Sequence, residues 1–348
     1  MPAKLPLTIA SDLLAWYDVH ARQLPWRAPP GTPAPDPYRV WLSEVMLQQT
    51  QVATVIPYFE AFTRRWPDFR ALAAVEDGEL MAAWAGLGYY ARARNLLACA
   101  RVVANDYGGA LPDTEEALRK LPGIGAYTAA AIAAIAFGRR AVVVDANVER
   151  VVARLAVLDT PLPAAKPEIA ALTDGITPDD RAGDFAQAMM DLGATICTAR
   201  APRCMLCPVR GECAAFARGA PEQWPQKAPR RVKPQRYGTM FWIEAEGHVL
   251  LVRRPDKGML GGMLALPTGP WEEAPPGLTD APIEADWQIA DTVVRHVFTH
   301  FALDCALAET RLDRQTDAVA DGQWWPLREM DAAGLPTLFA KAVAKMEK

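Results

Sequence analysis

The chain has 348 residues, 51% of them hydrophobic, and a formal net charge of −4. This length and composition suffice for a large buried core and for two domains, which excludes disorder as a general description. No apolar run approaches the roughly 20 residues of a membrane span, and the first residues lack the pattern of a signal peptide. The sequence therefore predicts a soluble intracellular protein.

The charges are unevenly distributed along the chain. Through Arg230, 24 Lys and Arg residues balance 24 Asp and Glu residues, whereas the remainder carries 13 against 17. A neutral or acidic chain lacks the basic signature of most DNA-binding proteins, so charge alone argues mildly against a nucleic-acid partner. Local arginines and oriented backbone amides could still bind phosphate.

The predicted elements fall into two groups. From Ile9 to about Phe216 the pattern is helical, except that propensity alone favours a strand at Val142–Val144. Residues Pro221–Arg236 combine four prolines with basic residues and predict an extended linker.

Beyond this linker the pattern changes to strands. Met240–Ala245 and Val249–Arg254 are strand-like runs joined at Glu246-Gly247, and alternate residues from Phe301 to Leu307 are hydrophobic. A closing helix is expected over Leu335–Lys348. The second part is therefore predicted to be a mixed α and β domain.

Four of the six cysteines lie close together in the sequence, at Cys197, Cys204, Cys207 and Cys213. Their spacing gives one close pair flanked by two more distant thiols, whereas a zinc ribbon normally has two close pairs. The asymmetric pattern favours an iron–sulfur cluster, because four thiolates can ligate one. Disulfides are not expected from this pattern.

A glycine-containing turn, Leu121-Pro122-Gly123-Ile124-Gly125, precedes an alanine-rich helix predicted over Thr128–Phe137. Glycines permit a tight turn whose amides face outward at the start of a helix, which is a suitable place for a DNA phosphate. On pattern alone, a plain connection between two helices is equally compatible.

The glycine turn, the sequence from Val144 to Val148 and the four cysteines together resemble the helix-hairpin-helix glycosylases of the endonuclease III superfamily. Within that superfamily, Trp41–Gln51 and Gly86–Tyr90 are similar to the adenine-removing MutY branch almost word for word. The resemblance implies an all-α N-terminal domain, also at Val142–Val144, with a 4Fe-4S cluster.

The resemblance implies the following domain boundaries: a glycosylase domain over residues 1–228 with its cluster loop at 197–213, a linker over 229–237, and a Nudix-like α+β domain over 238–348. It also implies a monofunctional, monomeric enzyme of the bacterial cytoplasm. Associated with the nucleoid, this enzyme would act on double-stranded DNA that holds adenine opposite 8-oxoguanine or guanine.

Two carboxylates carry the expected chemistry. On pattern alone, Glu44 would be a surface residue and Asp145 an ordinary helix N-cap. The resemblance instead makes Glu44 the acid that protonates adenine at N7, after desolvation has raised its pKa. It makes Asp145 the stabiliser of an oxocarbenium-like sugar, oriented by Asn147, and it places Tyr127 in the same catalytic set. Direct hydrolysis and a transient covalent intermediate both remain open.

The resemblance assigns further residues by their contacts with DNA. The adenine pocket would be formed by Trp26, Arg27, Leu47 and Gln187. The duplex would be contacted by Gln49, Tyr89, Leu121, Gly123 and Gly125. The target base must leave the helical stack before it can be cut, and Gln49 and Tyr89 would occupy or flank the vacated space.

The second domain partly resembles Nudix hydrolases at Gly261–Pro267, but the Glu-rich helix that binds magnesium is missing after Gly269. Nucleotide hydrolysis is therefore not expected. Residues Arg295–His300 resemble the loop with which MutY enzymes recognise 8-oxoguanine, which assigns lesion recognition to Phe298, Thr299 and His300. Thr299 replaces a more familiar serine and keeps its hydroxyl group.

Two other interpretations compete. An endonuclease III-like lyase would need a lysine nucleophile two residues after Gly125, but Tyr127 stands there and cannot form an imine. A non-catalytic DNA-binding or electron-transfer protein would not need Glu44 and Asp145 in these matching contexts.

Overall fold

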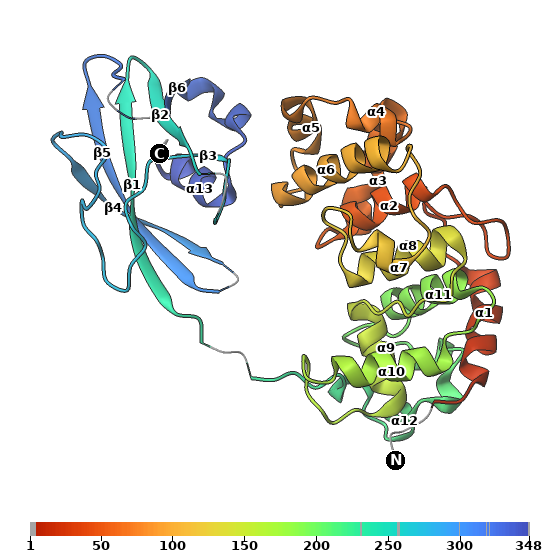
Figure 1. Cartoon of the computed structure of the whole chain (residues 1–348). Helices are drawn as coiled ribbons and strands as arrows, with labels where there is room; N and C mark the ends of the chain where they lie inside the picture. Colours follow the sequence, from red (N-terminus) through yellow and green to blue (C-terminus); the bar gives the residue numbers. More distant parts are fainter. Residues whose placement is uncertain are drawn as a thin grey trace. The chain divides into compact units, whose positions relative to one another are not determined.

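The computed structural model describes residues 5–229, 232–255, 258–298, 300–317, 319 and 321–346. It divides into two compact units, Met1–Pro229 and Arg230–Lys348 (Figure 1). None of the described helices is long and apolar enough to cross a membrane.

The described residues of the first unit form helices joined by loops, with one isolated β-bridge between Leu162 and Lys227. Its α-helices are α1 (Thr8–His20), α2 (Pro37–Leu47), α3 (Val52–Arg65), α4 (Phe69–Ala73), α5 (Asp77–Trp84), α6 (Tyr90–Asp106), α7 (Glu115–Leu118), α8 (Ala126–Phe137), α9 (Ala146–Ala156), α10 (Lys166–Ile176), α11 (Ala182–Thr195) and α12 (Ala214–Ala217). Short 3₁₀ turns cover Cys204–Leu206, Arg210–Glu212 and Pro221–Gln223. The residues Val142–Val144 form no strand, so the family resemblance was correct here and local propensity was not.

Helix α8 is the centre of this unit. Every residue from Thr128 to Ala136 is buried, as expected for a helix that is apolar on all sides. Small side chains let neighbours approach closely: a Cβ atom on Gly183 of α11 would lie 2.4 Å from the Ala134 carbonyl oxygen. The backbones of α8 and α11 therefore pack in direct contact.

The second unit is built on one mixed sheet. Its strands are β1 (Gln235–Ala245), β2 (His248–Arg253), β3 (Leu264–Ala265), β4 (Gln288–Val297), β5 (Ala302–Leu312) and β6 (Gly322–Pro326), followed by a 3₁₀ segment (Leu327–Ala333) and α13 (Thr337–Met346). The order is β3-β2-β1-β5-β4, with β6 paired to β2; β1 and β5 are parallel, and the other pairs are antiparallel.

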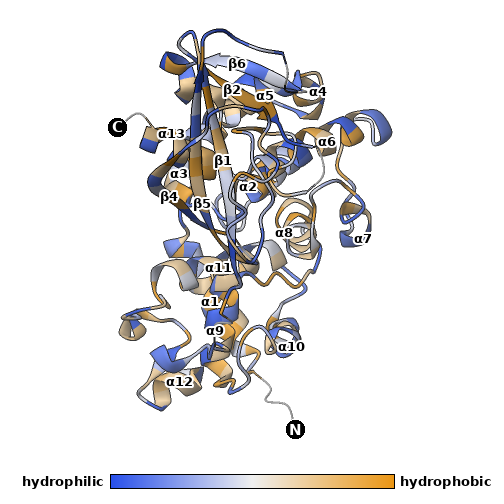
Figure 2. Cartoon of the chain, turned by 90° about the vertical axis from the view of Figure 1, so that its left-hand side faces the viewer, coloured by the Kyte–Doolittle hydropathy of each residue, from blue (hydrophilic) through white to orange (hydrophobic). Residues whose placement is uncertain are grey.

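Alternation along these strands explains the second core. Leu303, Cys305 and Leu307 of β5 are fully buried and pack with Phe339 of α13. Figure 2 shows hydrophobic residues along the strands of this sheet. The predicted hairpin and closing helix are confirmed, although β1 begins five residues earlier than expected.

The extended linker that composition predicts over Pro221–Arg236 is wrong at both of its ends. Trp224 is buried, and backbone hydrogen bonds join Leu162 to Gln226 and Ala228, so this stretch packs on the helical unit. At the other end, Gln235 and Arg236 already pair with β5. The aromatic side chain and the parallel strand partner outweigh the local effect of the prolines.

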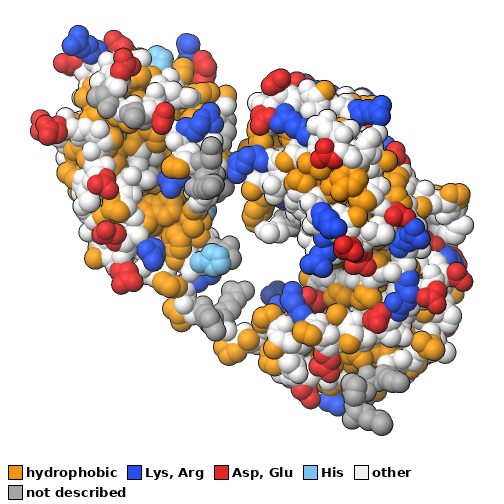
Figure 3. Space-filling model, viewed as in Figure 1, with side chains coloured by type: hydrophobic (Ala, Val, Ile, Leu, Met, Phe, Trp, Pro, Cys, Tyr) orange, Lys and Arg blue, Asp and Glu red, His pale blue; other side chains and the backbone are white. Residues whose placement is uncertain are grey.

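The visible face of the helical unit carries basic and acidic side chains side by side, without a single-sign patch (Figure 3). This agrees with the balanced charge count of residues 1–230. An anionic partner bound on this face would therefore be held by local groups rather than by a broad positive field.

Candidate active site

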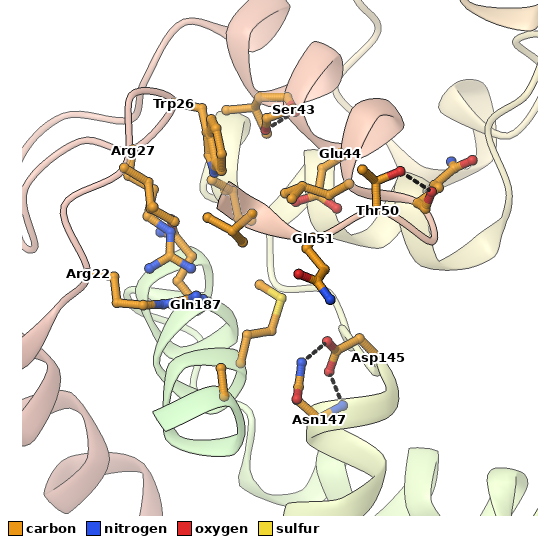
Figure 4. Close-up of a pocket in the computed structure, with 18 of the residues that line it drawn as sticks. Arg22, Trp26, Arg27, Ser43, Glu44, Thr50, Gln51, Asp145, Asn147 and Gln187 are labelled. Atoms are coloured by element: carbon orange, nitrogen blue, oxygen red, sulfur yellow. Dashed lines mark hydrogen bonds between the residues drawn. The ribbon is translucent and has the colours of Figure 1, made fainter. Parts of the chain in front are cut away.

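A cavity of about 580 Å³ opens in the helical unit. Its walls come from the segment before α2, from α2 and the loop after it, and from α8, α9 and α11 (Figure 4). Nine residues singled out in the sequence line it: Trp26, Arg27, Glu44, Leu47, Gln49, Tyr127, Asp145, Asn147 and Gln187. Segments more than 160 residues apart thus form one site.

Glu44 lies on the buried side of α2 and is 7% exposed. Burial raises the pKa of its carboxyl group to about 7, and the negative charge of Asp145 acts in the same direction. The Tyr127 hydroxyl and the positive charge of Arg27 lower this pKa, but they do not outweigh burial. Near neutral pH, Glu44 can therefore hold a proton and release it.

Asp145 is the N-cap of α9, and hydrogen bonds fix both of its oxygens. Its Oδ1 atom accepts from the Asn147 and Val148 amides at 2.8 and 2.7 Å, and its Oδ2 atom accepts from Asn147 Nδ2 at 2.7 Å (Figure 4). These donors hold the carboxyl group in one orientation at the start of the helix. The capping interpretation is thus confirmed, and the same bonds aim the carboxylate at the cavity.

A second layer of contacts holds Asn147 in place. Arg150 donates to Asn147 Oδ1 at 2.8 Å and to the carbonyl oxygen of Gly193 at 2.7 Å. A Cβ atom on Gly193 would lie 2.6 Å from Asn147 Cβ, so only glycine lets α11 approach this closely. Because Asn147 is held in place, its hydrogen bond fixes the position of the Asp145 carboxyl group.

The opposite part of the cavity carries positive charge. Asp191 of α11 is fully buried and binds Arg22 at 2.5 Å and Arg27 at 2.7 Å. Trp26 packs edge-on against Phe59 beside this cluster. Sequence reasoning missed Arg22 and Asp191; the signal was that Asp191 follows Gln187 by four residues on a helix.

The remaining predicted DNA contacts lie outside the cavity. Gly123 has a positive φ of 74°, and a Cβ atom there would lie 2.7 Å from Asn95 Cβ, so the turn requires glycine. Gly125 is the N-cap residue of α8. Leu121 is buried and anchors the turn from within. Tyr89 is 60% exposed, so it is not a core residue.

The four cysteines of the loop line one small cavity together with Arg154. The Arg154 guanidinium donates to Cys197 Sγ at 3.2 Å and to the Thr198 carbonyl oxygen at 2.7 Å. Within the described residues, no three His, Cys, Asp or Glu side chains come close enough together to hold one metal ion. Four thiols around a shared cavity are a donor set that can ligate an iron–sulfur cluster.

In the second unit, Phe298 starts a tight turn that its amide closes onto the Phe301 carbonyl oxygen at 2.9 Å. Its ring packs among Trp271, His296 and Phe301. His300 is exposed at this turn, and Thr299 lies outside the described residues. The Phe298 ring thus anchors the turn.

Comparison with known proteins gives these features a context. The model of the HhH-GPD superfamily base excision DNA repair proteins matches residues 42–174, and that of the NUDIX domain matches residues 239–345. Adenine DNA glycosylase from Homo sapiens is 34% identical across 95% of this chain and 72% of its own length. The Buchnera aphidicola enzyme of the same name is 30% identical across 97% of both chains.

The chain belongs to the adenine DNA glycosylase family. It is thus a DNA glycosylase of base excision repair. Among solved structures, a thermostable thymine-DNA glycosylase aligns with 61% of this chain and 96% of its own, with a TM-score of 0.55 and 31% identity. An endonuclease III–DNA complex, 24% identical with a TM-score of 0.51, shares the fold.

Proposed function

We propose that this glycosylase removes adenine paired with 8-oxoguanine or guanine, by hydrolysing the N-glycosidic bond. The observation that carries the proposal is the pairing of two carboxyl groups in one cavity, the buried Glu44 and the hydrogen-bonded Asp145. Glycosidic bonds are cut between an acid and a negatively charged stabiliser in this way. Adenine is inferred as the base because the relatives of this chain are adenine DNA glycosylases.

Protonation is the first task of the site, because neutral adenine leaves poorly. Glu44 donates its proton to adenine N7, since its pKa of about 7 keeps a large protonated fraction at neutral pH. The Tyr127 hydroxyl acts on the same carboxyl group and limits the rise of its pKa. Trp26, Arg27, Leu47 and Gln187 line the cavity and hold the extruded base.

Asp145 acts on the sugar. Its carboxylate stabilises the positive charge that develops as the base departs, and Asn147 keeps it oriented. Water then completes the reaction, either directly or after a transient bond to Asp145. Tyr127 stands where a lyase would place its lysine, so no Schiff base forms and the enzyme is monofunctional.

DNA contacts complete the site. The Leu121–Gly125 turn binds a phosphate at the start of α8, while Gln49 and Tyr89 enter the duplex as the base flips out. The protein acts as a monomer, because all of these groups lie in one chain. Its substrate is chromosomal, which places its work at the bacterial nucleoid.

The four loop cysteines hold a 4Fe-4S cluster, which supports the loop and supplies no bond-breaking chemistry. Purified protein should be brown with about four irons per chain. Cys204→Ser should weaken DNA binding, because Arg200, Arg203 and Arg210 flank these ligands and would lose their fixed positions. Zinc in place of iron would refute the assignment.

Lesion recognition belongs to the turn from Phe298 to Phe301, where Thr299 and His300 bind the damaged guanine. Each good contact to a base is worth about 1–3 kcal/mol of discrimination. His300→Ala should therefore lower the preference for 8-oxoguanine over guanine by roughly tenfold. His248→Ala, at the start of β2 in the same unit, is the control, and an equal loss there would remove this role.

The decisive experiment is a single-turnover assay on duplexes that hold adenine opposite 8-oxoguanine or guanine. Release of free adenine, without a product trapped by borohydride, is expected. Efficient trapping on abasic DNA would instead indicate a lyase. If no adenine were released while DNA still bound, a binding-only protein would remain.

A further inference from the structure

Arg92 is a buried arginine without an acidic partner. It lies in the first turn of α6 and is 9% exposed. Among the described residues, no carboxylate comes within ion-pair distance of it. A buried unpaired charge is costly, and the start of a helix is the wrong end for a cation. Such a residue must therefore gain from its other contacts.

Those contacts reach two separate loops. On one side, Arg92 Nη1 donates to the Met46 carbonyl oxygen at 2.8 Å and to that of Val45 at 3.2 Å, in the last turn of α2. Its Nη2 donates to Thr50 Oγ1 at 2.9 Å. On the other side, Nη2 donates to the Leu87 carbonyl oxygen at 3.1 Å. One planar guanidinium thus connects the end of α2 to the loop before α6.

Each loop carries an exposed residue with an unusual backbone conformation. Gln49 has a φ of 57° and Tyr89 a φ of 50°, in the left-handed region that few residues other than glycine adopt. Thr50 follows Gln49, and Leu87 lies two residues before Tyr89. The guanidinium also lies over the Tyr89 ring, 5.5 Å from its centre. Backbone strain of this kind persists only where the surroundings impose it.

We infer that Arg92 is a positioning residue that holds the Gln49 and Tyr89 loops at a fixed separation, so that both side chains enter the duplex together and drive the target base out. The inference rests on the proposed function. Arg92 also donates to carbonyl oxygens in the last turn of α2, the helix that carries Glu44. Its bonds therefore connect the two loops with the helix that holds the acid.

The guanidinium fork is essential to this role. Two nitrogens in a rigid plane can bond both loops at once, whereas a lysine ammonium offers a point charge on a flexible stem. Arg92→Lys keeps the charge and loses the simultaneous span. Arg92→Gln loses both.

The matched control is Arg101, further along α6. It also bonds backbone carbonyls, those of Ala73 and Val75, but it joins α6 to the segment between α4 and α5. Arg101→Gln removes these bonds and an ion pair with Asp77 from the same helix, and it leaves the two loops untouched. Thermal unfolding of all variants shows how much stability each loses.

The test uses full-length protein and two kinds of duplex. In the first, adenine is paired with 8-oxoguanine and 2-aminopurine is its neighbour, whose fluorescence rises on unstacking. In the second, adenine stands opposite an abasic site and costs less to extrude. Arg92→Gln should lose about a hundredfold in single-turnover excision on the paired duplex, with a smaller fluorescence rise. On the second duplex its loss should be at least about tenfold smaller.

Arg92→Lys should show the same substrate-dependent loss with less change in thermal stability, and Arg101→Gln should match the wild type on both duplexes. An equal loss on both duplexes would mean that Arg92 only stabilises the fold. Wild-type fluorescence from Arg92→Lys would also overturn the inference. If the wild type released no adenine from either duplex, the proposed function would fail, while the fluorescence comparison would still test Arg92.

Discussion

Glu44 and Asp145 are carboxyl groups on two walls of one cavity, and their surroundings differ in kind. The Glu44 carboxyl group is buried, and burial is the largest influence on its pKa. The wall at Asp145 is a helix N-terminus that supplies three hydrogen-bond donors. The first environment favours the protonated form of Glu44, whereas the second holds the Asp145 carboxyl group in one orientation. The different roles of these two carboxyl groups therefore come from their positions in the fold rather than from their residue types.

The largest expected effect comes from removing the acid. Glu44→Gln keeps the side-chain volume but has no proton to give, so single-turnover excision of adenine should fall by about 10³-fold or more while DNA affinity persists. Glu60→Gln, on the exposed face of α3, is the control. Wild-type excision by Glu44→Gln would end the distinction between the two walls.

Asp145→Asn removes the charge from the other wall. Excision should fall by about 10²–10³-fold, because the developing sugar cation loses its counter-charge. Asparagine is nearly as good an N-cap as aspartate, so thermal stability should change little. Asp36→Asn at the N-cap of α2 is the matched control, since its side chain also accepts an amide hydrogen bond. If both variants lost activity equally, Asp145 would only be a cap.

The next effect is the dependence of excision on pH. Because Glu44 must be protonated, the rate should fall as pH rises through about 7, approaching tenfold per unit above that value. This limb should be absent from the residual activity of Glu44→Gln. A rate that rises with pH through this range would assign Glu44 the role of a base.

The raised pKa of Glu44 should also appear in the pH dependence of the free energy of unfolding. Here Glu44→Gln should gain stability relative to the wild type at high pH, although it loses activity. The folded pKa of about 7 exceeds the ordinary value of 4.5, so between these values the folded protein holds a proton that the unfolded chain releases. The free energy of unfolding therefore falls as pH rises through this window, by on the order of 3 kcal/mol. Glu44→Gln lacks this loss. Its Tm should equal that of the wild type near pH 4 and exceed it near pH 8.

The sequence predicted the two walls unequally. Asp145 followed by a helix was recognisable as an N-cap, because capping depends on neighbours in the chain. Glu44 could not be told from a surface glutamate by pattern alone, since its burial comes from helices distant in the sequence. Only the family motif indicated its role.

Other features were beyond local reasoning for the same cause. Asp191 binds Arg22 and Arg27 across more than 160 residues, and Arg92 bonds the last turn of α2, 46 residues away. Trp224 packs against Val157 and Ala215 of the helical unit although the prolines around it predict an extended linker. Periodicity predicts which face of an element is buried, and it does not identify the partner.

The smallest expected effect comes from Tyr127, which lies beside Glu44 in the cavity. The Tyr127 hydroxyl, which donates to Met190 Sδ at 3.4 Å, also lowers the pKa of the nearby Glu44 carboxyl group, against the larger effect of burial. Tyr127→Phe removes this donor and leaves the ring in place, so the pKa of Glu44 should rise above about 7. The falling limb of the pH profile should then move to higher pH, with rates at neutral pH changed by less than about tenfold, the size of one hydrogen bond. Tyr38→Phe is the control, because Tyr38 is also buried and donates to the Trp66 carbonyl oxygen away from the cavity. A shift to lower pH in Tyr127→Phe would mean that the hydroxyl accepts from a protonated Glu44, in which case the tyrosine helps to keep the acid protonated.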